Sequence, residues 1–115
     1  MRWPFTFYTD KGLLEGAAGT ARGPLIFIRP NKKDDEGLYQ HELTHVKQWF
    51  ALLGFGFGIG YRFFPLFRLW AEVQAYKKQA EYYEDDRLHR FAILLATKYN
   101  LNITVGEALY LLRKN

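Results

Sequence analysis

Cysteine is absent from this chain of 115 residues. That absence excludes both a disulfide framework and a thiolate metal site, so any bound metal must be held by histidine, aspartate or glutamate. Histidine is itself scarce, with three residues in all. Long apolar runs are also missing, because the uncharged segment from Trp49 to Tyr61 is too short and too rich in glycine to span a membrane.

A concentrated basic segment is missing as well, although the formal net charge is +4. The basic residues come in scattered pairs such as Lys32-Lys33 and Lys77-Lys78. Nucleic-acid binding requires these charges on one surface, so we expect no nucleic-acid partner. The N-terminal sequence MRWPFTFYTDKG lacks the apolar core of a signal peptide. We therefore expect a cytoplasmic protein, with export by a non-classical route left open.

Aromatic residues are abundant, at 18% of the chain, beside 49% hydrophobic and 24% charged residues. This balance is typical of a folded protein, and the length fits one domain over residues 1–115 with a single modest core. The first thirty residues predict strands at Trp3–Thr9 and Leu25–Arg29, separated by a flexible loop at Gly16–Gly23. Prolines flank the second strand and cannot donate to a ladder, which favours an edge position. That strand consists of Leu25, Ile26, Phe27, Ile28 and Arg29.

The remainder predicts helices. Asp34 or Asp35 can cap a helix that runs to about Leu53, where glycine at every second position ends it. Its core face is predicted to contain Tyr39, Leu43, Val46, Phe50 and Leu53. Further helices are predicted over residues 65–83 and 86–99, and a capping box at Thr104 opens a last one. We expect an α+β fold with a small N-terminal antiparallel or mixed sheet followed by three to four helices.

The segment HELTH lies inside the first predicted helix. Its histidines, His41 and His45, are four residues apart and so share one helix face, where both imidazoles can bind one zinc ion at about 2.0–2.1 Å. Glu42 points roughly 100° round the helix, near the metal but not on it, where it can activate a zinc-bound water. This spacing predicts a zinc hydrolase with Glu42 as its catalytic base. The alternative is a histidine pair without metal on an ordinary amphipathic helix.

Catalytic zinc usually has a third protein ligand. The metzincin pattern is excluded, because Gln48 and Ala51 stand where it needs glycine and histidine. The remaining candidates are His89, Glu72, Glu81, Glu84, Asp85 and Asp86. Glu72 is the best of them because it lies mid-helix among apolar residues, and a buried carboxylate needs a partner. The alternative for Glu72 is a salt bridge to Arg68 or to Lys77-Lys78.

Two segments, LYQHELTHVKQW and RLWAEVQAY, resemble the gluzincin metallopeptidases, particularly their minimal single-domain forms, and small metallopeptidase-like proteins of bacteria and prophages. The resemblance covers about residues 25–80. It implies a zincin-like fold, hydrolysis of a peptide or protein substrate, zinc held by His41, His45 and Glu72, and Glu42 as general base. It also implies that the strand Leu25–Arg29 pairs with an extended substrate.

The same resemblance leaves two roles open. Larger gluzincins often place an acidic residue four positions after the ligand glutamate, where this chain has Tyr76. They also supply a tyrosine or histidine that stabilises the oxyanion, and Tyr76, Tyr83 and His89 are the candidates here. These three are not distinguished by their spacing.

A glycine- and aromatic-rich segment, residues 54–64, separates the two predicted ligand helices. It predicts a core-packing connection, a mobile flap beside the zinc, or a patch that contacts a membrane or protein through Phe55, Phe57 and Phe63. The last interpretation supports an alternative function. In that alternative, the chain is a non-catalytic gluzincin-like binding module that acts at a membrane or in a phage or secretion assembly.

Overall fold

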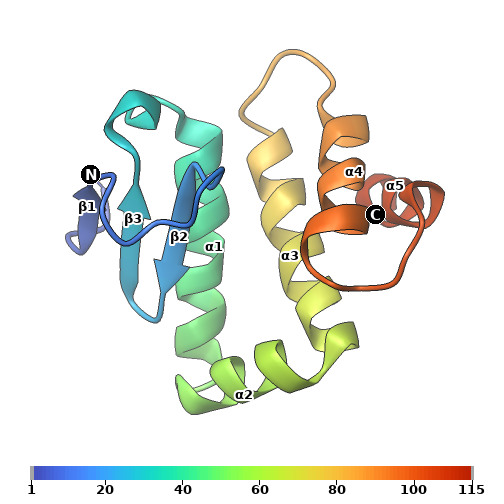
Figure 1. The fold of residues 1–115 in the computed structure, drawn as a ribbon, viewed down its shortest axis with the longest axis horizontal. Helices are drawn as coiled ribbons and strands as arrows, with labels where there is room; N and C mark the ends of the chain where they lie inside the picture. The colour runs from blue at the N-terminus through green and yellow to red at the C-terminus, as the bar shows by residue number, and fades with distance from the viewer. Residues whose placement is uncertain (1, 115) are drawn as a thin grey trace.

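In the computed structural model, which describes residues 2–114, a small mixed sheet precedes five α-helices (Figure 1). The elements are β1 (Thr6–Tyr8), β2 (Gly19–Arg22), β3 (Leu25–Ile28), a 3₁₀ turn (Pro30–Lys32), α1 (Glu36–Ala51), α2 (Phe55–Phe63), α3 (Pro65–Ala80), α4 (Leu88–Lys98) and α5 (Val105–Arg113). The predicted α+β class and N-terminal sheet are confirmed. The predicted helix number is too low by one, because α2 had not been expected.

Strand β3 is the centre of the sheet, parallel to β1 and antiparallel to β2. The predicted edge position of Leu25–Arg29 is therefore wrong. Pro24 and Pro30 lie just outside the paired residues, so neither removes a ladder hydrogen bond. The edge strand β2 comes from the segment predicted to be a loop. Gly23, with φ of 58°, allows the two-residue connection that folds β2 back along β3.

Helix α1 packs one face on the sheet. Asp35 caps the helix by accepting a hydrogen bond from the Leu38 backbone N–H at 3.0 Å. A first core cluster joins the sheet to α1; its buried members are Ile26, Ile28, Leu38, Tyr39 and Val46. Phe50 and Leu53, predicted to belong to this core, are exposed. Leu53 lies beyond the end of α1 at Ala51, in a turn where its φ is positive. Phe50 lies in the last turn of α1, where its ring packs against Trp3 and Trp49 and stays half exposed.

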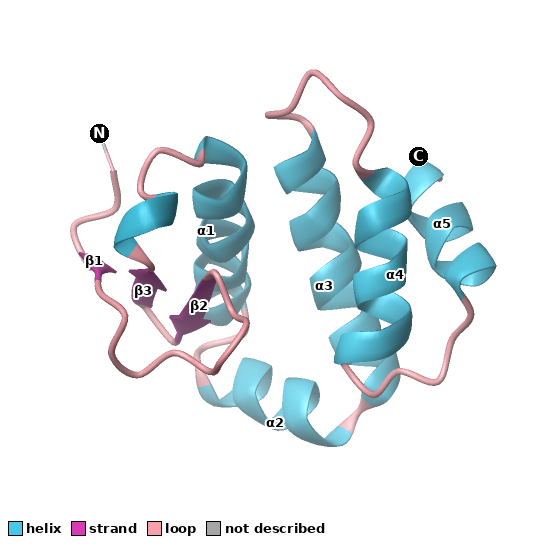
Figure 2. Ribbon diagram, turned by 45° about the horizontal axis from the view of Figure 1, so that its top comes forward, coloured by secondary structure: helices cyan, strands magenta, loops and turns pink. Residues whose placement is uncertain are grey.

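A second core cluster lies among α3, α4 and α5, on the other side of the molecule (Figure 2). Its buried members are Val73, Tyr76, Phe91, Ala92, Leu95, Leu101, Ala108 and Leu112. The predicted capping box at the start of α5 is confirmed, with Thr104 and Glu107 each bonding the other's backbone N–H. Helices α1 and α3 run side by side between the two clusters, and α2 joins them at one end (Figure 1).

Helix α2 forms in the segment whose glycines had predicted the end of helical structure. Tertiary contacts override the low helix propensity of glycine here. A Cβ on Gly60 would meet the Phe67 ring at 2.8 Å, and one on Gly54, where φ is 73°, would meet the Trp49 ring at 2.8 Å. The glycines thus permit close packing of α2 between α1 and α3. Among residues 2–114, no helix combines the length and apolar character needed to cross a membrane.

Candidate metal site between α1 and α3

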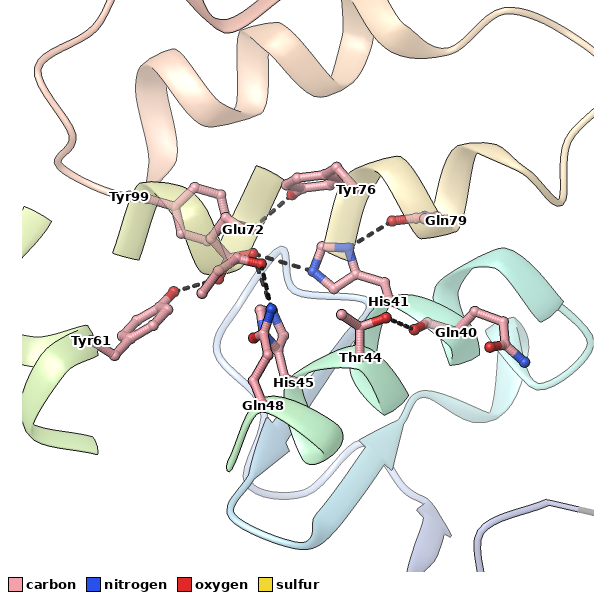
Figure 3. A network of polar contacts seen from close by, with 11 residues as sticks. Gln40, His41, Thr44, His45, Gln48, Tyr61, Glu72, Tyr76, Gln79 and Tyr99 are labelled. Atoms are coloured by element: carbon pink, nitrogen blue, oxygen red, sulfur yellow. Dashed lines mark hydrogen bonds and ion pairs between the residues drawn. The ribbon is translucent and has the colours of Figure 1, made fainter. Parts of the chain in front are cut away.

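Three residues predicted as metal ligands meet between α1 and α3 (Figure 3). The Oε1 atom of Glu72 lies 3.3 Å from Nε2 of His41 and 3.2 Å from Nε2 of His45. All three side chains are buried, and Ala71 and Ala75, which are fully buried, let the two helices approach closely. Glu72 makes no salt bridge to Arg68, Lys77 or Lys78 among the described residues, so the alternative partner is wrong.

Both histidines are oriented by glutamine side chains. Nδ1 of His41 is 2.9 Å from Oε1 of Gln79, and Nδ1 of His45 is 2.9 Å from Oε1 of Gln48. An amide oxygen only accepts hydrogen bonds, so each Nδ1 carries the proton and donates. In the neutral tautomer the lone pair is then on Nε2, the atom that faces Glu72. This is the tautomer that a metal ligand requires.

The orientation of each glutamine amide is determined by a second contact. The Gln48 amide nitrogen donates to the carbonyl oxygen of Ala71 at 3.1 Å. The Gln79 amide nitrogen donates to the Tyr83 hydroxyl at 2.9 Å, and that hydroxyl donates to Asp35 at 2.6 Å. The Ala71 carbonyl oxygen can only accept, and the Tyr83 hydroxyl, which donates its hydrogen to Asp35, can also only accept. Each glutamine must therefore turn its amide nitrogen to that acceptor and its amide oxygen to the histidine. Asp35, the N-cap of α1, is thus connected to His41 through the side chains of Tyr83 and Gln79.

Glu42 lies next to this group but outside the hydrogen-bond network. Metal-binding atoms of His41, Glu42 and His45 all lie within 4.8 Å of one another. The Glu42 side chain is buried and makes no hydrogen bond to another residue between 2 and 114. The site therefore offers two carboxylates. Glu72 Oε1 is within 3.3 Å of both Nε2 atoms, whereas a Glu42 carboxylate oxygen lies within 4.8 Å of the histidine ring nitrogens without a hydrogen bond to them among the described residues.

The donor set fits a zinc ion. Four ligands at about 2.0–2.1 Å in a tetrahedron are separated from one another by roughly 3.3–3.4 Å. The 3.3 and 3.2 Å that separate Glu72 Oε1 from the two histidine Nε2 atoms match this edge length. Two imidazoles and one carboxylate are also a donor set of catalytic zinc sites. His41 and His45, with either Glu72 or Glu42, are the side chains placed to hold a metal ion.

The ionisation of these groups is strongly coupled. Burial alone would lower the pKa of His45, but the adjacent Glu72 carboxylate outweighs it and raises that pKa to about 9. For Glu72, burial acts to raise the pKa, but His45 and His41 outweigh it and hold it far below its usual range. Burial raises the pKa of Glu42, against the opposing effect of the two histidines. Without metal, a proton therefore joins His45 to Glu72, and a bound cation would displace it.

Without metal, the stability of the protein is expected to fall as the pH rises from 6.5 to about 9. The pKa of His45 is 6.5 as an isolated side chain and about 9 in the fold, so its protonated form stabilises the fold fully below pH 6.5 and not above pH 9. The loss is on the order of 3 kcal/mol. Urea unfolding in the presence of a chelator across this range measures it. A His45→Gln variant should show a flatter profile, and an equally steep one would contradict the assignment.

Three tyrosines surround the ligands from the α2 and α3 side. The Tyr61 hydroxyl donates to Oε2 of Glu72 at 2.5 Å, so it holds the carboxylate oxygen that faces away from the histidines. The ring of Tyr76 lies edge-on to His41 at 4.4 Å, and its hydroxyl is 2.7 Å from that of Tyr99. Burial raises the pKa of all three phenols, which keeps them protonated and able to donate.

The predicted oxyanion stabilisers lie in different places. The Tyr76 hydroxyl is paired with Tyr99, and the Tyr83 hydroxyl with Asp35 and Gln79. His89 is exposed near the start of α4 and is not among the residues that line the cavity beside the site. Four other acidic candidates for the third ligand are exposed at the boundary between α3 and α4: Glu81, Glu84, Asp85 and Asp86.

Sequence analysis missed Tyr61, Tyr99, Gln48 and Gln79 as site residues. The spacing of two of them could have been used. Gln48 is three residues after His45 and Gln79 is two helical turns after Glu72, so each shares a helix face with a predicted ligand. Tyr61 had none, since its segment was not expected to be helical. Tyr99 lies beyond the last residue of α4 and reaches the site only through the tertiary fold.

An open cavity of about 530 Å³ borders the site. One wall is the edge strand β2, from Gly19 to Arg22, and another contains Phe57 and Tyr61 of α2. A Cβ on Gly19 would lie 3.6 Å from Oε2 of Glu42, so β2 passes close to that carboxylate. The strand with an unpaired edge beside the site is thus β2, whereas Leu25–Ile28 is internal.

No protein-family model matches this chain, and no curated protein or solved structure is detectably similar to it. The zincin-like fold and the gluzincin resemblance therefore stay predictions.

Replacing Gln79 with leucine is expected to weaken zinc binding by roughly 10–100-fold, because His41 would lose the acceptor that selects its tautomer. Competition with a chromogenic chelator measures the affinity. Gln74→Leu is the matched control, since Gln74 is exposed on the same helix. Equal affinities for the two variants would mean that Gln79 does not orient a ligand.

Proposed function

We propose that this chain is a zinc-dependent metallopeptidase of the gluzincin type, with zinc held by His41, His45 and Glu72. The observation that carries the proposal is the position of Glu72 Oε1, 3.3 and 3.2 Å from two Nε2 atoms whose opposite ring nitrogens are committed to amide oxygens. With both Nδ1 atoms donating to glutamines, the Nε2 lone pair of each neutral imidazole is left for a metal ion. The donor set is the one that catalytic zinc uses in peptidases.

Zinc bound in such a site polarises a carbonyl oxygen and makes water more acidic. In the proposed reaction Glu42 takes the proton of the attacking water and passes it to the amine that leaves. Two features suit it to this role: it makes no hydrogen bond to the other described residues, and burial raises its pKa above that of an ordinary glutamate. Tyr61 and Tyr99 line the cavity, and for either to donate to the oxyanion its hydroxyl must first leave its present partner, which is Glu72 for Tyr61 and Tyr76 for Tyr99.

The proposed substrate is an extended peptide or protein segment that pairs with the edge of β2. An unpaired strand edge offers backbone donors and acceptors at the spacing that an extended peptide needs. Gly19 brings this edge near Glu42 without a side chain in between. The substrate was predicted to pair with Leu25–Arg29, and we now propose that it pairs with Gly19–Arg22 instead.

The competing proposal is a non-catalytic gluzincin-like binding module at a membrane or in a phage or secretion assembly. It is favoured by the apolar residues that α2 leaves exposed, among them Phe55 and Phe63. Both proposals include a bound metal. They differ in whether a peptide is cleaved, and hence in the need for Glu42.

Two measurements on one preparation test the proposal. Elemental analysis of protein purified without added metal should find one zinc per chain. Incubation with a complex peptide mixture, followed by mass spectrometry of new termini, should show cleavage that a chelator stops and added zinc restores. Zinc without cleavage would favour the binding module. Protein that neither contains zinc nor binds added zinc would refute both proposals.

A further inference from the structure

Helix α2 has two apolar faces. The inner face carries Phe57, Gly60 and Tyr61, which are partly covered by α1, α3 and the site. The outer face carries Phe55, Ile59 and Phe63, spaced by four residues, and these are 86%, 56% and 64% exposed. An ordinary surface helix turns its polar face to water, so the outward apolar face of α2 requires a covering surface.

The exposed apolar face extends beyond α2 at both ends. Leu53, directly before the helix, is 87% exposed, and Leu66, at the start of α3, is 81% exposed. Leu53, Phe55, Ile59 and Phe63 border one surface hollow, and Leu66 is exposed at the start of the next helix. Helix α2 lies at the end of the molecule opposite the loop between α3 and α4 (Figure 1). We call this set, Leu53, Phe55, Ile59, Phe63 and Leu66, the α2 patch.

The charged residues in the segment that contains the α2 patch have one sign. Residues 43–71 contain no acidic residue and three basic ones, Lys47, Arg62 and Arg68. Arg68 points inward and donates to the carbonyl oxygens of Tyr61 and Tyr99, which leaves Lys47 and Arg62 exposed. Arg62 lies on α2 itself, 5.5 Å from the Phe63 ring.

Acidic residues are concentrated at the other end of the molecule. The start of α1 and the connection from α3 to α4 lie there (Figure 1). Seven of the twelve acidic residues fall in these two segments, although basic residues accompany them: Asp34, Asp35, Glu36, Glu81, Glu84, Asp85 and Asp86. Lys32, Lys33, Lys77, Lys78 and Arg87 largely offset these acidic residues, so the one-sided charge that could orient the protein toward an anionic surface lies in residues 43–71.

We propose that the α2 patch docks on the surface of an anionic phospholipid bilayer. Phe55, Ile59 and Phe63 enter the boundary between headgroups and acyl chains, while Arg62 and Lys47 lie at the level of the phosphates. A second copy of the chain fits this surface less well. Pairing two patches would bring the Arg62 and Lys47 side chains of both copies together without an acidic residue in the patch to face them.

Co-sedimentation with vesicles tests the docking independently of metal and of peptide cleavage. The full chain is expected to bind vesicles of equal parts phosphatidylglycerol and phosphatidylcholine, and to bind pure phosphatidylcholine at least about tenfold more weakly. Rising salt should weaken binding to the anionic vesicles. The triple variant Phe55→Ser, Ile59→Ser, Phe63→Ser should lose binding by more than about tenfold.

The matched control replaces three exposed hydrophobic residues elsewhere, with Leu14→Ser, Ile93→Ser and Tyr110→Ser, and should bind like the wild type. A single Arg62→Gln variant, which leaves the apolar packing intact, should bind more weakly and depend less on salt. The proposal is overturned if the wild type does not bind anionic vesicles, or if the α2 triple variant binds as well as the control. It is also overturned if sedimentation shows a dimer that only the α2 triple variant loses.

Discussion

Replacing Glu42 with glutamine is expected to lower peptide cleavage by about a thousandfold while the protein stays folded and keeps its zinc. Glutamine has nearly the same shape as glutamate but cannot take a proton, and a positioned general base contributes roughly 10²–10⁴-fold. The buried Glu42 makes no hydrogen bond to the described residues that the substitution would break. The expected loss of cleavage rate is therefore due to the missing proton transfer and not to unfolding.

Initial rates on one cleaved peptide, together with zinc content and a thermal melt, separate the outcomes. Glu81→Gln is the control, because Glu81 is exposed after α3 and its one ion pair among residues 2–114 is with Lys78. Unchanged cleavage by the Glu42 variant would exclude Glu42 as the base. Loss of zinc along with activity would instead make Glu42 the third ligand, which its position within 4.8 Å of both histidines allows.

Zinc is expected to raise the melting temperature of the metal-free protein by about 15 °C or more. A ligand present at a thousandfold its dissociation constant stabilises the folded state by about 4 kcal/mol, and 1 kcal/mol shifts the melting temperature of a small domain by roughly 4–8 °C. In Glu72→Ala and in the isosteric Glu72→Gln, zinc should raise the melting temperature by only a few degrees. These variants keep two imidazole ligands but lose the carboxylate, so they should bind zinc more weakly.

Differential scanning calorimetry of chelator-treated protein, with and without zinc, measures this increase. Each variant is compared with its own metal-free form, since Glu72→Ala also removes the contacts to His41, His45 and Tyr61. Gln74→Ala on the exposed side of α3 is the control. A full increase in both Glu72 variants would exclude Glu72 as a ligand and with it the gluzincin assignment.

The residues that meet at the site could be predicted from the sequence because their signals are local. HELTH needs only helical periodicity to place His41 and His45 on one face. Glu72 was identifiable because a carboxylate among apolar residues in mid-helix needs a buried partner. Neither argument required knowledge of which helices pack together.

What could not be predicted depends on contacts between distant segments. Proline next to a strand does not reveal whether it lies inside or outside the paired residues, so β3 was assigned to the edge. Glycine opposes a helix on average, but at Gly60 the ring of Phe67 occupies the space that a side chain would fill. Helical spacing places Gln79 on the Glu72 side of α3, but that it orients His41, 38 positions away, depends on how α3 packs against α1.

The placement of the site between the two hydrophobic clusters affects how the chain unfolds. The cluster of the sheet and α1 shares no buried residue with the cluster of α3, α4 and α5. The side-chain hydrogen bonds between α1 and α3 among the described residues involve His41, His45, Gln48, Glu72 and Gln79. An ion bound from both helices would act as a cross-link between two halves that each pack on their own. Metal occupancy would then decide whether the protein melts as one cooperative unit or in two steps.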